Sequence, residues 1–576
     1  MSQDKLAYHT EFLPQKVKKF TKQTRKVYKI QVIQVKCKKR YLLFFTPFWH
    51  YYLIPLKLDD MIMSRITQSH TKPSAWQAFY HAYFNKQSVA LLFLGFAAGI
   101  PILLIFSSLG LWLREAGIDR ATVTMFSWAA LGYSFKFIWA PLVDTLPLPI
   151  LTRLLGRRRS WLLLTQILVI TALVLMAMTN PQSGEAVLSI MAAGAVLLGF
   201  SSASQDIVID AYRIESAPAD MQPALSATYV MGYRIGMIVS GAGALYLADF
   251  FGSTMEAYSY AAWQKTYLIM AAVMGIGILT TLVISEPKTV VRPITQTSKN
   301  YLRLVVVFIL SVLAFILVFR GMGSILPETD DVLLQFVYGT VRFMLSIIAF
   351  GLVGFGLVQA KIAPKEMVVK TWVDPMVDFF HRYGKKAVLL LVLIGLYRIS
   401  DIIAGNISNI FYQDLGFSKT QIAEAVKVVG VVASIAGGFI GGWLAQKISI
   451  IKAMSLGAIL ACTTNLLFIL LFYTPTVPMM YFAVITDNLA AGLASTVFIA
   501  FLSALTSIRF TAVQYALFSS LMTLLPKLIG GYSGSIVDAT NYAFFFGFTF
   551  VVGIPVLLLI YLVNKHIDIN QPQVDE

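Results

Sequence analysis

Charged residues are scarce in this chain. Only 13% of its 576 residues are Asp, Glu, Lys or Arg, whereas a soluble domain carries about 25%. Hydrophobic residues make up 57%, and they gather in runs of roughly 20, the length that a helix needs to cross a bilayer core. The composition therefore excludes an ordinary soluble protein and predicts an all-α polytopic membrane protein.

Cysteine and histidine are also rare. The two cysteines, Cys37 and Cys462, stand in a basic stretch and in an apolar run, a pattern that does not indicate a disulfide framework. The six histidines fall outside the apolar runs. We therefore expect no metal site, no histidine proton relay inside the membrane and no cofactor beyond an ion gradient.

Acidic residues are outnumbered, and the formal net charge is +17. In a nucleic-acid-binding protein the excess Lys and Arg would cluster on a soluble domain. Here they lie mostly in loops between apolar runs and in the first 60 residues. Because cytoplasmic loops of membrane proteins are enriched in Lys and Arg, we expect contact with the lipid bilayer and none with nucleic acid.

About fourteen apolar runs are long enough to be membrane spans, at roughly 20 residues each. The expected ranges are 89–113, 121–144, 161–179, 186–211, 222–248, 265–284, 303–319, 333–358, 387–411, 421–445, 453–473, 479–505, 510–537 and 542–563. Basic residues gather in the loops after even-numbered spans, whereas the other loops, such as 180–185 and 326–331, are neutral or acidic. The positive-inside rule then places the even loops and both termini in the cytoplasm.

The longest even loops flank spans seven and eight. That pair, at 303–358, is expected to be an insert between two six-helix halves, at 85–285 and 387–563, with a cytoplasmic tail at 564–576. A twelve-helix core with two extra central helices resembles the major-facilitator fold. Small residues recur four apart in two of the spans, where they favour close helix packing; they are Gly232, Gly236 and Ser240, and Gly437, Gly438, Gly441 and Gly442.

Ionisable residues inside the spans each need a partner or a function, because burying one in a membrane costs at least about 2.5 kcal/mol. Asp206 and Asp210 are four apart and share a helix face, and Arg398 and Asp401 are close enough to pair. The others are Lys136, Arg213, Arg234, Asp487 and Lys527. Two interpretations are open: ion pairs that hold helices together, or a proton-coupled binding site shared by the two halves.

Asp144 and the basic run Arg157, Arg158 and Arg159 lie at the cytoplasmic ends of spans two and three. Their spacing resembles a loop signature of major facilitators, which implies a gate, although the arginines would also anchor the loop on the cytoplasmic side. Among the aromatic residues near the buried charges, Tyr133 and Tyr233 either pack between helices or line a cavity for a sugar.

Eight stretches together carry a family resemblance. They are FLGFAAGIP (93–101), SFKFIWAPLVD (134–144), GRRRSWLLLTQ (156–166), SASQDIVIDAYR (202–213), GYRIGMIVSG (232–241), LYRISD (396–401), DNLAAGLAST (487–496) and QYALFSSL (514–521). From about residue 85 to residue 565 the chain resembles the AmpG-type muropeptide permeases of the major-facilitator superfamily, which are described as having fourteen helices.

This resemblance implies proton-driven import of N-acetylglucosaminyl-anhydro-N-acetylmuramyl sugars, with or without peptide, from periplasm to cytoplasm. It also implies a bacterial inner membrane, a part in peptidoglycan recycling and β-lactamase induction, and no enzymatic activity. The polar motif residues of the family map onto Lys136, Gln205, Asp206, Asp210, Arg234, Asp401, Asp487, Asn488 and Gln514.

We expect proton coupling at Asp206, Asp210 and Asp401. Substrate contacts are expected from Lys136, Gln205, Arg234, Tyr133, Tyr233, Arg398, Asp487, Asn488 and Gln514. Fold alone does not give substrate, so transport of another anionic solute, such as acetyl-CoA, stays open. A channel or a membrane enzyme is a further alternative, although the largest loops, 285–302 and 359–386, are small and basic. We expect a monomer.

Residues 1–60 have no counterpart in this family. Lys and Arg are dense between Lys16 and Arg40, and the apolar run that follows is interrupted by Pro47 and Pro55. The run is too broken for a span, and the order of a signal peptide is missing. Two interpretations remain: a basic anchor on the membrane surface, or translated upstream sequence before a natural start at Met61 or Met63.

Removing this arm gives a first prediction. A chain that starts at Met61 is expected to transport as well as the full chain, because the arm carries no span and no motif. Uptake by the two chains, compared at equal amounts of membrane-inserted protein, measures this. Lost uptake at normal insertion would show that the arm is functional.

Overall fold

The computed structural model describes residues 82–119, 122–123, 126, 129, 132–254, 257–287, 297–327, 332–530 and 533–567. The predictions for the arm at residues 1–60, for a start at Met61 or Met63 and for residues 568–576 of the tail lie outside the described residues. The described helices belong to one compact unit, Ala75–Glu576. Every regular element in the described ranges is a helix, as the apolar composition predicts.

The first group of helices follows the region expected as the first half. Long apolar segments fold as helices because lipid offers the backbone no hydrogen-bond partner outside the segment. The elements are α4 (Lys86–Ile105), α5 (Ser107–Glu115), α7 (Gly132–Phe135), η4 (Lys136–Ile138), α8 (Ala140–Thr145), α9 (Leu151–Leu155), α10 (Arg157–Ala177), η5 (Pro181–Ser183), α11 (Glu185–Glu215), η6 (Ala219–Met221), α12 (Gln222–Ile238), η7 (Val239–Gly243), α13 (Ala244–Phe250) and α14 (Tyr260–Val283).

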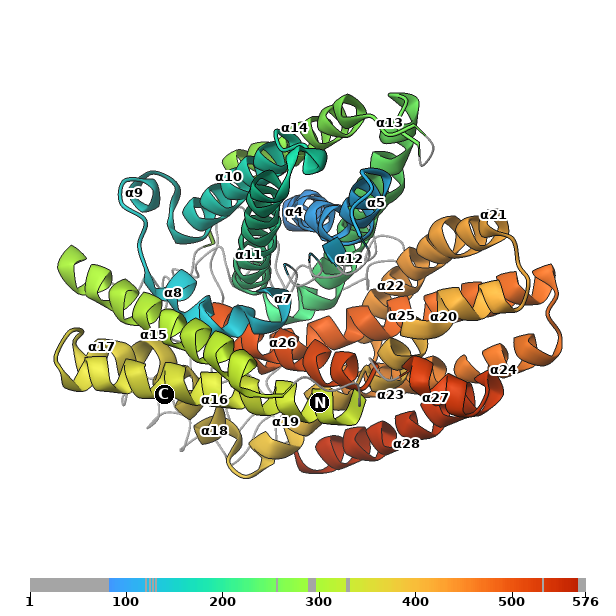
Figure 1. Cartoon of the computed structure of the whole chain (residues 1–576). Helices are drawn as coiled ribbons and strands as arrows, with labels where there is room; N and C mark the ends of the chain where they lie inside the picture. Colours follow the sequence, from blue (N-terminus) through green and yellow to red (C-terminus); the bar gives the residue numbers. More distant parts are fainter. Residues whose placement is uncertain are drawn as a thin grey trace, which may run out of the picture. The chain divides into compact units, whose positions relative to one another are not determined.

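Two long helices and a short helical segment come next. The region expected as the insert contains α15 (Ser298–Ile325) and α16 (Val332–Gln359), which run side by side (Figure 1); we keep the name insert for these two helices. Most of their side chains face away from the protein, as expected for helices in lipid. A segment that we call the strap follows, formed by α17 (Lys365–Val368), η8 (Val369–Val373) and α18 (Asp374–Tyr383).

The second group of helices fills the rest of the chain. Its elements are α19 (Lys386–Leu396), α20 (Ile399–Asp414), α21 (Lys419–Ile422), η9 (Ala423–Val429), α22 (Gly430–Lys447), α23 (Ile450–Thr463), α24 (Asn465–Tyr473), α25 (Val477–Leu505), η10 (Ile508–Phe510), α26 (Thr511–Gly530), α27 (Ser533–Ala539) and α28 (Tyr542–His566). The two groups meet where α11 contacts α26 and where α12 contacts α22 and α25.

In the described residues, twelve helices are long and apolar enough to cross a membrane. They coincide with twelve of the expected spans. The other two are not among the twelve. The range 121–144 contains α7, η4 and α8, and the range 510–537 contains α26 and α27, on either side of residues 531–532, which lie outside the described ranges. Pro141 at the start of α8 and Pro526 inside α26 interrupt the pattern of backbone hydrogen bonds. The expected number of fourteen is therefore approximate.

The glycines of the two groups bring helix backbones into direct contact. A Cβ atom on Gly232 would lie 2.0 Å from the carbonyl oxygen of Leu92 in α4, and one on Gly236 would lie 2.3 Å from that of Phe96. In the second group, a Cβ on Gly437 would lie 2.0 Å from the carbonyl oxygen of Leu489. The glycine spacing in the sequence predicts close helix packing, and the structure identifies the partners as α4 for α12 and α25 for α22.

Replacing these glycines gives a stability prediction. Gly232→Ala and Gly236→Ala are each expected to destabilise the protein by about 1–3 kcal/mol, because the new methyl group meets backbone that cannot move aside alone. Thermal unfolding in detergent measures the loss. Gly275→Ala in α14 is the matched control, since nothing lies within 4 Å of its added Cβ. Equal melting temperatures for all three variants would contradict the packing argument.

Candidate functional site

Lys136 lies at a break in a membrane helix. The α7 helix ends at Phe135, Lys136 begins the short 3₁₀ element η4, and α8 begins at Ala140. The break leaves the Lys136 side chain buried, at 6% exposure, in the interior of the helix group. A discontinuous helix inside a membrane is tolerated where it borders a polar site. The sequence predicts Lys136 inside a continuous span, and this prediction is wrong, because the helix is broken at Lys136.

The two carboxylates of α11 face this lysine. Lys136 Nζ lies 3.7 Å from Asp210 Oδ2 and 4.0 Å from Asp206 Oδ2. Asp210 also accepts a hydrogen bond from Arg213 Nη2, at 3.3 Å. Within the described residues, Asp206 Oδ1 is buried without a hydrogen-bond partner. Asp210 is thus held by two cations, whereas Asp206 has only the more distant contact with Lys136.

Polar and aromatic side chains surround the carboxylates. The hydroxyl groups of Tyr133 and Ser202 hydrogen-bond each other, and Tyr133 and Tyr233 both lie within electrostatic range of Asp206. Gln205 precedes Asp206 on α11 and is fully buried, and neither atom of its amide has a partner in the part of the chain that the structure describes. An unpaired buried amide is costly. The Gln205 amide is therefore available to donate and accept hydrogen bonds with a ligand.

A second charged cluster lies in the second group of helices. Arg398 stands at the junction of α19 and α20, again a helix break, and forms an ion pair with Asp401. Asp487 of α25 lies within electrostatic range of this pair and accepts a hydrogen bond from Thr464 Oγ1, at 2.9 Å. Asn488 donates its side-chain amide to Val484 O, one turn earlier in its own helix. Each group therefore has a cation at a helix break beside carboxylates.

Arg234 of the first group interacts electrostatically with the second cluster. It lies on α12 in the first group, and its guanidinium is within electrostatic range of Arg398 and Asp401 in the second. Among the described residues, no carboxylate comes within 4.0 Å of it to form an ion pair. Two cations from opposite groups thus interact electrostatically, and the one carboxylate that acts on both is Asp401, which is paired with Arg398. Two positive charges with one carboxylate attract a further anion.

Three of the four expected gate residues, Asp144, Arg157 and Arg158, meet at one end of the helices. We call it the basic end, where Arg157, Arg158, Arg382 and Thr511 lie. Arg158 is 1% exposed, and its Nη2 atom donates to Asp144 Oδ1 at 2.8 Å and to Thr511 Oγ1 at 2.9 Å. Glu215 accepts from Arg158, and it also bonds the Thr511 hydroxyl. Arg157 lies 3.6 Å from Asp144. The network joins α8, α10 and α11 to α26, and so links the two groups of helices.

Two members of this network were absent from the sequence analysis. Glu215 and Thr511 lie at the end of α11 and at the start of α26. Glu215 follows the span that carries Asp206 and Asp210 but sits just outside its expected range. The available signal was only a carboxylate at the end of this span, since Arg158, which it binds, is 57 residues away in sequence.

Arg159 and Gln514 have other partners. Arg159 donates to the carbonyl oxygens of Thr281, at 2.9 Å, and Leu282, at 2.7 Å, and so holds the end of α14. Gln514 is fully buried, accepts from Arg382 Nη2 at 2.8 Å and donates to Asp378 Oδ2 at 2.8 Å in the strap. The structure therefore does not bring Arg159 to Asp144, or Gln514 to either charged cluster.

Arg213 extends from the Lys136 cluster to the second group. Besides Asp210, it donates to Ser226 Oγ at 3.1 Å and to Ser503 Oγ in α25 at 2.7 Å. Its guanidinium also lies over the ring of Tyr515 in α26, 5.0 Å from the ring centre. The Arg213 side chain thus connects Asp210 of α11 to α25 and α26 of the second group.

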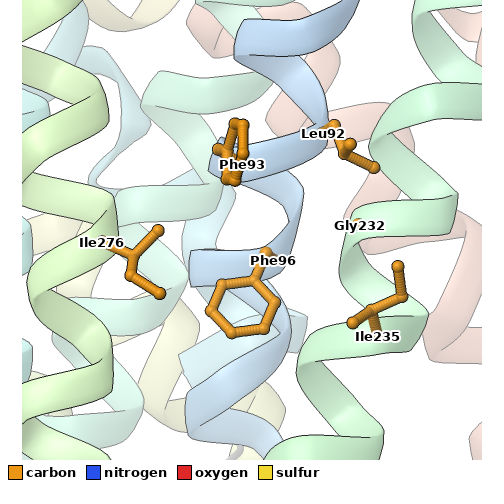
Figure 2. Close-up of a pocket in the computed structure, with 6 residues that line it drawn as sticks. All are labelled: Leu92, Phe93, Phe96, Gly232, Ile235 and Ile276. Carbon is orange, nitrogen blue, oxygen red and sulfur yellow. The ribbon is translucent and has the colours of Figure 1, made fainter.

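An apolar pocket lies apart from these charges, between α4, α12 and α14. Figure 2 shows the side chains around it, and none of them is polar. The lining residues are Leu92, Phe93, Phe96, Gly232, Ile235 and Ile276. The pocket offers no hydrogen bond or charge to an anionic sugar, so we assign the candidate site to the charged clusters instead.

Sequence comparison gives consistent relatives. Residues 87–397 match the family model described as Major Facilitator Superfamily. The chain is 31% identical to the anhydromuropeptide permease of Escherichia coli K12, over 85% of this chain and 82% of that protein. It is 29% identical to a protein of Rickettsia felis named putative transporter AmpG 4, over 83% of this chain and 97% of that protein.

Solved structures of low sequence identity share the fold. One is the proton:xylose symporter XylE bound to 6-bromo-6-deoxy-D-glucose, with a TM-score of 0.53 at 12% identity, covering 84% of this chain and 96% of that one. Another is the transporter FucP in the outward conformation, with a TM-score of 0.50 at 11% identity, covering 84% and 99%. Fold, family model and relatives agree on a membrane transporter rather than an enzyme, and the chain belongs to the AmpG-type permeases of the Major Facilitator Superfamily.

Proposed function

We propose that this protein imports anhydro-muropeptides, GlcNAc-anhydroMurNAc with or without its peptide, by proton symport across the bacterial inner membrane. The relative in Escherichia coli is named an anhydromuropeptide permease, and the stretches that carry the family resemblance include the residues of both charged clusters. The imported fragments feed peptidoglycan recycling and take part in β-lactamase induction. The protein acts as a monomer.

One observation carries the substrate class. Arg234 and Arg398, from opposite groups of helices, lie near each other with Asp401 as the nearby carboxylate. A cation in a membrane interior needs a counter-ion. The carboxylate of a muropeptide supplies that counter-ion and bridges the two groups, and the hydroxyl groups of Tyr133 and Tyr233 are suited to the sugar. Lys136 and the unpaired Gln205 amide complete the polar lining.

Proton coupling is assigned to Asp206, Asp210 and Asp401. Lys136 lies within 4.0 Å of both α11 carboxylates. When a substrate carboxylate engages Lys136, the α11 carboxylates lose part of their positive neighbour, and proton binding by one of them becomes more favourable. Arg213 then transmits the change, because it bonds both Asp210 and Ser503 across the group boundary. Asp487 and Asn488 extend the site into the second group.

The Arg158 network is proposed as the gate on the cytoplasmic side. It closes the basic end by joining Asp144 and Glu215 to Thr511. The basic loops lie at this end, and the positive-inside rule therefore assigns it to the cytoplasm together with both termini. Substrate then enters from the periplasm and leaves after the network opens.

Uptake into proteoliposomes tests this function. Vesicles that contain the purified protein are expected to accumulate labelled GlcNAc-anhydroMurNAc against its gradient when the outside is acidified, and a protonophore should abolish the accumulation. Acetyl-CoA in tenfold excess should not compete. Uptake of acetyl-CoA without uptake of the muropeptide would favour the alternative anionic solute, and chemical conversion of the muropeptide without uptake would favour an enzyme.

A further inference from the structure

The break at Lys136 leaves a backbone carbonyl without its usual helical donor. In an α-helix, the carbonyl oxygen of Ile138 would accept from the N–H of Leu142. Here Leu142 N donates to Trp139 O instead, at 2.9 Å. Pro141 adds to the disruption, because it has no N–H to offer to Phe137. A backbone carbonyl inside a membrane protein needs a partner.

The strap supplies this partner. Trp372 of η8 donates its indole Nε1–H to Ile138 O at 3.2 Å. The indole ring stacks on Phe308 of α15, with ring centres 6.3 Å apart and planes 11° from parallel. It also packs on a buried cluster formed by Leu142, Leu304 and Met367. Trp372 therefore packs on α15 of the insert and at the same time donates a hydrogen bond to the broken helix.

The insert contacts the other side of the break as well. Phe343 of α16 lies against Phe135, which immediately precedes Lys136, with ring centres 5.1 Å apart. One contact from α16 thus lies just before the break, and the hydrogen bond from Trp372 lies two residues after Lys136. The segment that positions Lys136 is braced on both sides by elements that lie outside the twelve-helix layout.

The far end of the strap is firmly attached to the second group. Arg382 donates to Leu505 O at 3.1 Å and to Gln514 Oε1 at 2.8 Å. Phe379 is 1% exposed and contacts the ring of Phe518 at 5.1 Å. The strap reaches the first group through the indole hydrogen bond to Ile138 O and through apolar packing of Trp372 and Met367 with Leu142. The hydrogen bond is the polar part of this contact, and it depends on the geometry of the break.

We propose that Trp372 is a positioning residue for the substrate and proton site. Its indole N–H holds the Lys136–Ile138 break in the shape that presents the Lys136 ammonium to Asp206 and Asp210, and the strap anchored at Arg382 holds the indole. The inference rests on the proposed function in so far as Lys136 contacts the substrate. A tryptophan near a membrane surface can also serve merely as an interfacial anchor, and the test separates the two roles.

Trp372→Phe keeps an aromatic ring on Phe308 but removes the N–H donor. We expect KM for the muropeptide to rise about three- to tenfold, the effect of one hydrogen bond, with a much smaller change in the maximal rate. Trp161→Phe is the matched control, because Trp161 also donates its indole N–H to a backbone carbonyl, Leu146 O at 2.9 Å, but beyond the break. It should leave KM unchanged.

A double variant tests whether Trp372 acts through Lys136. In a Lys136→Gln background, Trp372→Phe is expected to have no further effect on KM, since residues that act through one another are not additive. An interfacial anchor would lower the amount of inserted protein and leave KM unchanged in both backgrounds. That result, or fully additive effects on KM, would overturn the inference.

Hydrogen exchange gives a measurement that needs no substrate. Peptides that cover residues 132–143 should exchange faster in Trp372→Phe than in the wild type and in Trp161→Phe. If exchange is faster in Trp372→Phe but the wild-type protein takes up no muropeptide, the role of Trp372 at the break is supported. Only the proposed function would then be contradicted. Unchanged exchange and unchanged KM in an active transporter would overturn the role of Trp372.

Discussion

Asp206→Asn is expected to abolish proton-driven accumulation of the muropeptide, while the protein still folds and inserts into the membrane. Asp206 is the less well paired of the two α11 carboxylates, with Lys136 Nζ at 4.0 Å and one oxygen without a partner in the described residues. Removing its charge therefore breaks little structure and lowers the cost of insertion. Uptake under an imposed pH gradient should fall to the level seen without a gradient, while exchange of labelled for unlabelled substrate continues.

Asp210→Asn should abolish accumulation and also reduce stability. Asp210 faces both Lys136 and Arg213, and the loss of one partner from a buried pair typically costs about 3–5 kcal/mol because the remaining charge stays buried. Asp220→Asn, at an exposed position in η6, is the control and should change neither property. If both α11 variants keep full gradient-driven uptake, the proton site lies elsewhere, and Asp401 and Asp487 become the candidates.

Lys136→Gln should weaken substrate binding and move the pH profile of uptake upward. The loss of one charged hydrogen bond to the substrate carboxylate corresponds to about 1–3 kcal/mol, or roughly a 5- to 150-fold rise in the dissociation constant. Without the ammonium group, the α11 carboxylates bind a proton at a lower proton concentration, since a nearby cation no longer opposes protonation. Binding and uptake across a pH series measure both effects.

Two further variants sharpen this result. Lys136→Arg keeps the charge and should restore part of the affinity, although the guanidinium fits a different geometry. Lys265→Gln removes an exposed lysine of α14 and should be silent. Unchanged affinity together with an unchanged pH profile for Lys136→Gln would reduce Lys136 to a structural ion-pair partner.

Most of the fold could be predicted from the sequence because membrane helices leave strong local signals. Apolar length located the twelve spans, and the four-residue spacing of Gly232 and Gly236 indicated close helix packing, although not that the partner is α4. The break at Lys136 was missed, although Pro141 was visible, because a proline alone does not distinguish a kinked helix from an interrupted one. The broken segment is also contacted by Trp372, which is 234 residues from its partner Ile138 in sequence.

The candidate site could be predicted only in part from the sequence. Helical spacing placed Asp206 beside Asp210 and Arg398 beside Asp401, since residues three or four apart in a helical segment lie close together. The partners of Arg158 could not be predicted, because Glu215 and Thr511 come from two other helices and meet only in the folded protein. The same holds for Gln514, whose motif indicated the charged site although its amide is engaged by the strap.

The backbone contacts of the glycines have a mechanical consequence. Along α4 with α12, and along α22 with α25, a single methyl group has no room at the points of closest approach. Neither pair can slide by one residue, because the shift would drive a side chain into the opposing backbone. We therefore expect the two helices of each pair to move together as a rigid body throughout the transport cycle. In an alternating-access cycle, we then expect the movement between the two groups to take place where α12 contacts α22 and α25.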